Sequence, residues 1–189
     1  MHRLFSHYVS IWVKKGYISH REAPWLLYAL ERKTAALITA IPVLGFGFLF
    51  APISTVVSFY LGFTSLRTYT NGYHANTVLG CAFYSVLLEW FALAFIIKYR
   101  IPVILNALLI LSASIIAVAS PYNHPSVRLT AEERIKCRRC SQLCLAIQIL
   151  VLFFLRLLGV DRIADGLVLG IVMTAGMLVI AYVHDLGGM

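Results

Sequence analysis

The chain has 189 residues, of which 60% are hydrophobic and 13% charged, and its formal net charge is +8. An apolar share this large exceeds that of soluble domains and excludes an ordinary soluble globular protein. The positive charge does not indicate a nucleic-acid partner, because the basic residues stand at the ends of apolar segments and not on a polar module with interleaved aromatic residues. We therefore expect an integral membrane protein that contacts membrane lipids.

Residues 3–15 are predicted to form an amphipathic helix that lies in the membrane interface. Its apolar residues recur at helical spacing: Leu4, Tyr8, Ile11 and Trp12. Basic residues occupy the remaining face. Gly16 ends this helix, and Ser19 with Glu22 three residues later resembles a capping box. We expect the next helix to start there, outside the lipid.

Apolar segments then follow one another along the rest of the chain: 35–66, 78–97, 102–119, 142–158 and 164–183. A crossing needs about 20 residues, so the first segment is too long for one crossing. Pro42, Gly45, Gly47 and Pro52 indicate a turn in its middle. The sequence thus predicts an all-α, polytopic membrane protein with about six transmembrane helices plus the N-terminal interfacial helix, folded as a single domain, 1–189.

A polar run from Arg67 to Cys81 interrupts the apolar segments. Backbone that leaves a helix at membrane depth is tolerated only where protein or a wet cavity satisfies it, so we expect this run to line a site near the cytoplasmic face. Asn71-Gly72 supplies a turn, which would let His74 fold back toward Cys81. On a straight helix the two side chains would lie about 10 Å apart along the axis, beyond hydrogen-bond reach.

These residue types fit nucleophilic catalysis. A histidine can take the proton of a thiol, and the resulting thiolate attacks carbonyl groups. Arg67 could bind a carboxylate, a peptide carbonyl or an oxyanion, or could simply be a flanking charge that reaches the interface. A cysteine in a membrane helix is also common as a small packing residue, so the residues alone leave catalysis open.

Glu89, within the next apolar segment, supports a different class of function. Ionisable groups inside membrane segments mark ion or substrate pathways. Arg67, His74 and Glu89 could therefore belong to the substrate or proton path of a small membrane transporter or exporter. The same glutamate could instead be a structural residue paired with a cation.

The stretch 120–139 is predicted to be a cytoplasmic basic loop, which places both termini in the cytoplasm as well. Four cysteines occur in the chain, and we expect them to be reduced thiols: Cys81, Cys137, Cys140 and Cys144. One CxxC without a second pair does not indicate a zinc site, and we expect neither metal nor cofactor. Gly166 and Gly170 form a small-xxx-small pattern that leaves a homodimer open.

Two groups of residues resemble the accessory gene regulator B family, bacterial membrane cysteine endopeptidases that process a cyclic quorum-sensing peptide. They are Arg67, Asn71-Gly72-Tyr73-His74-Ala75 with Cys81, and Ser120-Pro121-Tyr122-Asn123-His124-Pro125. The resemblance covers essentially the full length. Where the family commonly has Gly-Gly, this chain has Asn71-Gly72, and Asn also tolerates the left-handed conformation.

The resemblance implies that His74 and Cys81 are the catalytic pair, with Arg67, Asn71, Gly72 and Asn123 binding substrate or supporting the site. It further implies a substrate with an amphipathic leader and an acidic C-terminal tail, and a location in the bacterial cell membrane. The tail would leave through a Cys81 thioester, and a side chain of the peptide would then close a lactone or thiolactone ring.

Overall fold

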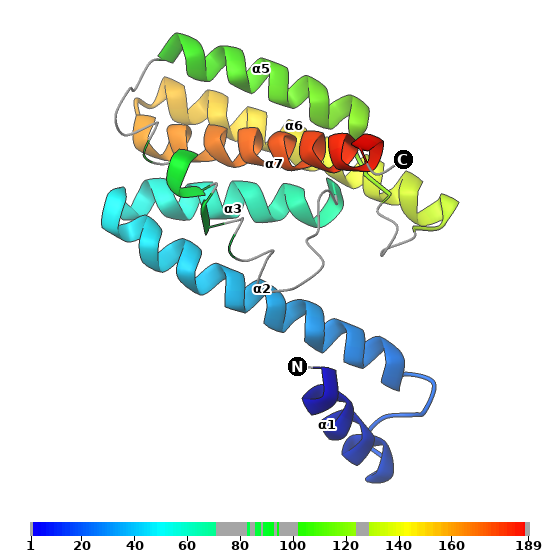
Figure 1. Cartoon of the computed structure of the whole chain (residues 1–189). Coiled ribbons are helices and arrows are strands. Elements are labelled where there is room, and N and C mark those ends of the chain that lie inside the picture. Colours follow the sequence, from blue (N-terminus) through cyan, green and yellow to red (C-terminus); the bar gives the residue numbers. More distant parts are fainter. Residues whose placement is uncertain are drawn as a thin grey trace. The chain divides into compact units, whose positions relative to one another are not determined.

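A computed structural model describes residues 2–70, 83, 86–87, 89–92, 94, 102–123 and 129–187. These residues form helices and no strand, as the sequence predicts (Figure 1). The helices are α1 (His2–Lys14), α2 (Ala23–Phe50), α3 (Ile53–Thr70), α5 (Pro102–Ala119), α6 (Ala131–Leu157) and α7 (Asp161–Gly187). Residue contacts divide the chain into two compact units, Met1–Pro42 and Val43–Met189, so the single domain remains a prediction.

The N-terminal unit contains the predicted amphipathic helix. Helix α1 keeps Leu4 and Tyr8 exposed, and Gly16 follows it with a φ of 74°, a left-handed conformation that glycine adopts without strain. The predicted capping box is present: the Ser19 backbone N–H donates to the Glu22 carboxylate at 3.0 Å, and the Glu22 N–H donates to the Ser19 hydroxyl at 3.3 Å. These bonds satisfy donors that a helix start leaves without partners.

The long apolar segment 35–66 does turn, but later than three of its four marker residues suggested. Helix α2 runs through Pro42, Gly45 and Gly47 to Phe50, and the turn lies at Ala51 and Pro52. Proline and glycine do not by themselves end a helix in an apolar segment, because neighbouring groups can satisfy the freed carbonyl. Only Pro52, which stands directly before α3, marks the turn.

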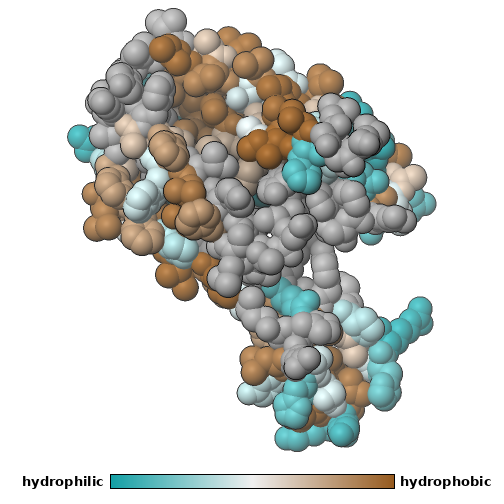
Figure 2. Space-filling view, in the orientation of Figure 1, coloured by the Kyte–Doolittle hydropathy of each residue, from teal (hydrophilic) through white to brown (hydrophobic). Residues whose placement is uncertain are grey.

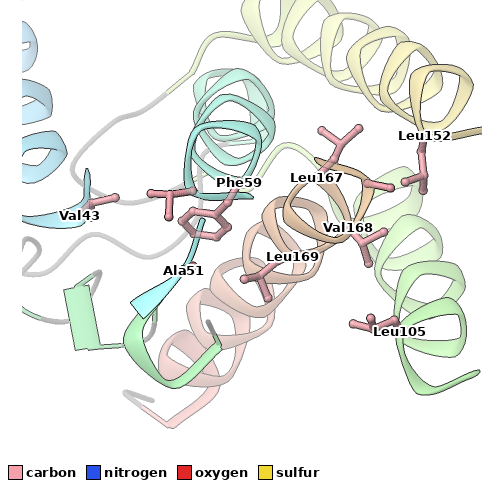
Figure 3. Packing of buried hydrophobic residues seen from close by; sticks show 10 residues of the cluster. Val43, Ala51, Phe59, Leu105, Leu152, Leu167, Val168 and Leu169 are labelled. Carbon is pink, nitrogen blue, oxygen red and sulfur yellow. The ribbon is translucent and has the colours of Figure 1, made fainter. Parts of the chain in front are cut away.

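Helix α7 is central in the second unit and packs against α3, α5 and α6 (Figure 1). Two buried clusters fill the space between these helices. The first cluster includes Phe59, Leu105, Leu152 and Val168, whose side chains converge from four helices (Figure 3). The second cluster has these buried members: Leu66, Ile116, Tyr122, Leu145, Ile171, Ala175, Leu178 and Ala181. It lies toward the ends of α3 and α5, where the candidate site begins.

Two glycines allow α7 to approach α3 very closely. A Cβ atom on Gly170 would lie 2.7 Å from the Phe63 backbone nitrogen and 2.8 Å from the Phe59 carbonyl oxygen, and one on Gly166 would overlap Ser58 and Thr55. Real Cβ contacts do not approach this closely, so only glycine fits. The small-xxx-small face is therefore occupied within the chain and does not supply a dimer contact.

Among the described residues, two helices are long and apolar enough to cross a membrane, α6 and α7. Their surroundings differ, because 61% of the apolar stretch of α7 is buried in the protein but only 22% of that of α6. Helix α6 instead exposes large apolar side chains: Leu143, Ile147, Leu150, Phe153, Phe154 and Leu157. Hydrophobic residues also cover much of the visible face of the bundle (Figure 2). Such a surface fits lipid contact, although the predicted six crossings exceed the spans that these two helices account for.

The basic stretch 120–139 is only partly a loop. Helix α6 begins at Ala131, where the Thr130 hydroxyl accepts from the Glu133 N–H and the Glu133 carboxylate accepts from the Thr130 N–H at 2.8 Å. The sequence Thr-x-x-Glu is a capping box that we overlooked among the charges. Residues 131–139 are thus the helical start of α6, and the prediction of a loop there was wrong.

Candidate functional site

The last turn of α3 carries the first residue of the predicted catalytic run. Arg67 is half-buried and its Nη1 atom is fully buried, while Leu66 and Thr70 are completely buried. Arg67 is therefore more than an exposed flanking charge. The carbonyl groups of the last turn of a helix have no partner within that helix, and donors from other parts of the protein can satisfy them.

The loop after α5 supplies one such donor. The Tyr122 backbone N–H donates to the Thr70 carbonyl oxygen at 3.0 Å, so the Ser120-Pro121-Tyr122-Asn123 motif lies against the end of α3. About fifty positions separate the two segments in sequence, yet in the fold Tyr122 of the second motif group is bonded to Thr70, which lies between Arg67 and Asn71 of the first. Helices α3 and α5 end on the same side of the bundle (Figure 1).

Further polar contacts hold this loop to α6 and α7. The Ser120 hydroxyl donates to the Ser141 oxygen at 2.8 Å, and the Tyr182 hydroxyl donates to the Ala119 carbonyl oxygen at 2.8 Å. The Tyr122 and Tyr182 rings meet edge to face with their centroids 5.0 Å apart. We call this group the junction, and its members are Thr70, Ser120, Tyr122, Ser141 and Tyr182.

Sequence reasoning missed Ser141 and Tyr182. Ser141 directly precedes the apolar segment 142–158, and Tyr182 lies within the apolar segment 164–183; a polar residue in or beside an apolar stretch is the signal that could have found them. Their partners in the fold lie in another helix or loop, so spacing along the chain could not reveal what they bind.

Asn123 has a structural role in the loop. Its side-chain carbonyl Oδ1 accepts a hydrogen bond from the Leu129 N–H at 2.9 Å. This bond spans the residues between the loop motif and the start of α6. The amide group is exposed, and the atom that an oxyanion site would use, the donor Nδ2, is on the other side of the same amide.

The first turns of α6 place basic side chains at the same end. Arg134, Lys136, Arg138 and Arg139 are exposed there, and hydrophilic residues gather where this helix begins (Figure 2). Cys137, Cys140 and Cys144 are partly buried. In the part of the chain that the structure describes, no group of three or more His, Cys, Asp or Glu side chains could hold a metal ion.

Glu89 is buried, with 1% of its surface exposed, and neither carboxylate oxygen has a hydrogen-bond partner among the described residues. The neighbouring Trp90 contacts Phe46 and Phe50, which precede the start of α3. Arg67 is fourteen residues further along α3 than Ile53, or about 21 Å at the rise of an α-helix. The structure therefore does not bring Glu89 and Arg67 together in one compact site.

Four predicted site residues, Asn71, Gly72, His74 and Cys81, lie outside the described residues. What the fold does locate is the residue before them, Thr70, and its contact with Tyr122. The geometry of the predicted catalytic pair thus stays a prediction, while the junction at which this segment leaves α3 is defined.

The helices, the apolar surface of α6 and the polar end of the bundle define a membrane-associated helical protein. The family model of accessory gene regulator B matches residues 6–181. The chain belongs to this family, which connects it with the processing of a quorum-sensing peptide. Comparison with curated proteins and with solved structures found no match.

Proposed function

We propose that this protein is a membrane cysteine endopeptidase that removes the C-terminal tail of a short autoinducing-peptide precursor and promotes closure of its ring. The observation that carries the proposal is the bond between Tyr122 and Thr70, because it places the second motif group of the family beside the residue that directly precedes Asn71 of the first. His74 and Cys81 follow Thr70 within eleven residues. The family match over residues 6–181 supports the same assignment.

In the proposed reaction, His74 takes the proton of the Cys81 thiol, and the thiolate attacks the peptide carbonyl at the cleavage point. The carbon–nitrogen bond breaks, the leaving amine takes a proton from His74, and the peptide remains as a thioester on Cys81. A thiol or hydroxyl of the peptide then attacks this thioester, forms the thiolactone or lactone and releases the Cys81 thiol. A tethered nucleophile competes well with water because its effective concentration is high.

The remaining residues support this reaction. Arg67, half-buried at the end of α3, could bind a carboxylate or carbonyl of the peptide, and Asn71 and Gly72 would form the turn before His74. The exposed basic turns of α6 suit an acidic tail. In this proposal the protein is a multi-pass protein of the bacterial cell membrane, with its termini and site at the cytoplasmic face and α1 in the lipid interface.

The proposal is tested with the full chain in lipid vesicles and a precursor that has an amphipathic leader, a core with Cys or Ser and an acidic tail. Cys81→Ala and His74→Ala should each abolish release of the tail, measured by mass spectrometry, and Cys140→Ala should retain it. The wild-type chain should also accumulate a thioester adduct that hydroxylamine removes. Tail release by Cys81→Ala at the wild-type rate would refute the proposal.

One observation favours a second candidate, a small transporter or exporter. Glu89 is buried with no hydrogen-bond partner among the described residues, as a proton-carrying group in a membrane segment would be. Trp90, next to Glu89, packs against Phe50 before the start of α3, whereas Arg67 lies near the end of that helix. This argues against one compact transport site that contains both residues, but not against a longer path through the protein. A transporter should lose activity in Glu89→Gln and tolerate Cys81→Ala, which is the reverse of the pattern expected for the peptidase.

A further inference from the structure

We propose that α1 binds a surface of anionic lipid headgroups through one exposed stripe of apolar and aromatic side chains. The inference rests on the proposed position of the protein in the membrane, and it adds which face of α1 meets the lipid and which lipid this face prefers. The segment concerned, residues 2–17, lies in the N-terminal unit and contains none of the residues of the proposed reaction.

Two apolar stripes run along α1, and their surroundings differ. Residues four positions apart share one face of a helix. The first stripe faces the protein, because Val9 is 5% exposed and Phe5 and Val13, one turn before and after it, are partly buried. The second stripe is shifted by one position and is exposed: Leu4, Tyr8 and Trp12. The protein thus covers the first stripe, and the second is open to a partner.

The C-terminal cap of α1 lengthens the exposed stripe. The Tyr17 N–H donates to the Trp12 carbonyl oxygen at 3.0 Å. The Gly16 N–H donates to the Val13 carbonyl oxygen at the same distance, and Gly16 has a φ of 74°. This pair of bonds turns the chain back at the glycine, so that the next residue lies beside the end of the helix. Tyr17, which is 74% exposed, therefore adds an aromatic ring to the end that carries Trp12.

These ring types fit the boundary between lipid and water. Tryptophan and tyrosine combine an apolar ring with one polar group, and they are enriched where a membrane meets water. Hydrophobic and hydrophilic residues lie side by side on the part of the surface that α1 forms (Figure 2). The exposed stripe of α1 therefore suits the headgroup region of a bilayer.

The charge of the segment selects the kind of lipid. Residues 2–17 include Arg3, Lys14 and Lys15 and no acidic residue, and both lysines are exposed. A lysine can lay its alkyl chain along an apolar surface while its ammonium group reaches the headgroups. Basic residues next to a membrane are attracted to anionic lipids. We therefore expect α1 to prefer an anionic headgroup to a zwitterionic one.

The experiment measures which lipid contacts Trp12. The full chain, with Trp25 and Trp90 replaced by phenylalanine, is placed in vesicles of equal amounts of phosphatidylcholine and phosphatidylglycerol, so that the fluorescence reports on Trp12 alone. Bromine atoms on the acyl chains quench a tryptophan that they approach, and they are carried by one lipid at a time. Brominated phosphatidylglycerol should quench Trp12 about twice as strongly as brominated phosphatidylcholine.

A pair of double variants tests the role of charge. Lys14→Gln with Lys15→Gln should make the quenching by the two lipids equal, because the attraction to the anionic headgroup is removed. Arg134→Gln with Arg162→Gln is the matched control, since it removes two exposed charges from α6 and α7. The control should keep the difference between the lipids.

A pair of single variants tests the face of the helix. Leu4→Gln places a polar group in the exposed stripe and should reduce the quenching by both lipids about twofold. Ser10 is exposed and, six positions further on, lies on the opposite side of α1. Ser10→Gln should leave the quenching unchanged.

Equal quenching by the two lipids in the parent protein would overturn the preference for anionic headgroups. No quenching by either lipid would overturn the lipid contact itself, and quenching of Trp12 by a brominated leader peptide would then assign the stripe to the precursor. If the background without Trp25 and Trp90 does not fold, as judged by thermal unfolding, the difference in quenching between the wild-type chain and Trp12→Phe gives the same quantity.

Tail release in the same vesicles separates this inference from the proposed function. A parent protein that releases the tail but shows no lipid quenching of Trp12 would refute the lipid contact and leave the peptidase intact. A parent protein that prefers the anionic lipid but releases no tail would refute the peptidase and support the role of α1.

Discussion

The Arg156 guanidinium joins the two ends of the α6–α7 turn, with its Nη2 atom 2.7 Å from Oδ1 of Asp165. Its Nη1 atom lies at the same distance from Asp161. The two acceptors differ in burial, because the Asp165 side chain is 9% exposed and that of Asp161 is 61% exposed. One arginine thus makes a buried and an exposed ion pair of equal length.

We predict that the buried pair contributes more to stability. Asp165→Ala should lower the free energy of unfolding by about 2 kcal/mol, since it removes a charge-assisted hydrogen bond from a buried position. Asp161→Ala should cost less than about 1 kcal/mol, as exposed pairs do. Thermal unfolding of both variants in detergent micelles checks the difference, and equal losses would contradict it.

The contact between α3 and α7 gives a second prediction. Gly170→Ala should destabilise the protein by about 1–3 kcal/mol, because the added methyl group meets the backbone of Phe59 and Phe63 and the helices must separate. Gly176→Ala on the same helix is the matched control, as its Cβ would meet nothing within 4 Å. It should be neutral or slightly stabilising.

The comparison is made by thermal unfolding of the two variants under one set of conditions. If Gly170→Ala had the same unfolding temperature as the wild type, the inference that α3 and α7 approach too closely for a side chain at this position would be refuted. Because Gly170 faces the chain's own α3, the substitution should also leave chemical crosslinking between copies unchanged at a temperature where the protein is folded.

Asn123 gives a prediction that distinguishes its two proposed roles. Asn123→Asp keeps an acceptor for the Leu129 N–H and removes the Nδ2 donor, whereas Asn123→Ala removes both. We expect Asn123→Asp to retain most tail cleavage and Asn123→Ala to lose about 1 kcal/mol of stability together with part of the activity. A tail-cleavage rate that collapsed in Asn123→Asp, in protein of normal stability, would instead assign Asn123 to the oxyanion.

The start of α2 predicts a dependence on pH. Hydrogen bonds from the side chain and then the backbone of Ser19 hold the pKa of the Glu22 carboxyl below its usual value. The stabilisation by this contact is therefore complete above the usual pKa and is lost as the pH falls through the lowered one. Nuclear magnetic resonance of the Ser19 amide in micelles should show a titration at that lower pH.

Ser19→Ala is the control for this titration. It removes the hydroxyl donor, which is the larger cause, and keeps the backbone N–H donor. The midpoint of Glu22 should therefore rise part of the way to its usual value. A midpoint that did not move would show that the hydroxyl has no part in the capping contact.

Several elements were predictable because their signals are local. The helical spacing of Leu4 and Tyr8, the break at Gly16 and the Ser19–Glu22 box all involve residues within a few positions of one another. The bounds of α5 agree with the apolar segment 102–119 for the same reason. The Thr130–Glu133 box was equally local and was overlooked because the surrounding charges resembled a loop.

Other predictions failed or stayed open because they depend on what a residue meets in space. Pro42 lies inside a helix, since a proline ends a helix only where no neighbour satisfies the freed carbonyl. Gly166 and Gly170 matched a pattern for contact between helices, but the pattern does not say whether the partner helix belongs to the same chain. The fold assigns it to α3.

By itself the sequence determined the apolar, all-helical character of this protein and the motif residues of its family, because composition and short-range periodicity are properties of the chain alone. Only the tertiary structure decided that Tyr122 meets Thr70, that Asn123 bonds to Leu129 and that Trp90, the neighbour of Glu89, packs against Phe50 before the start of α3. These relationships join residues many positions apart. They follow from how the helices pack, which no local spacing specifies.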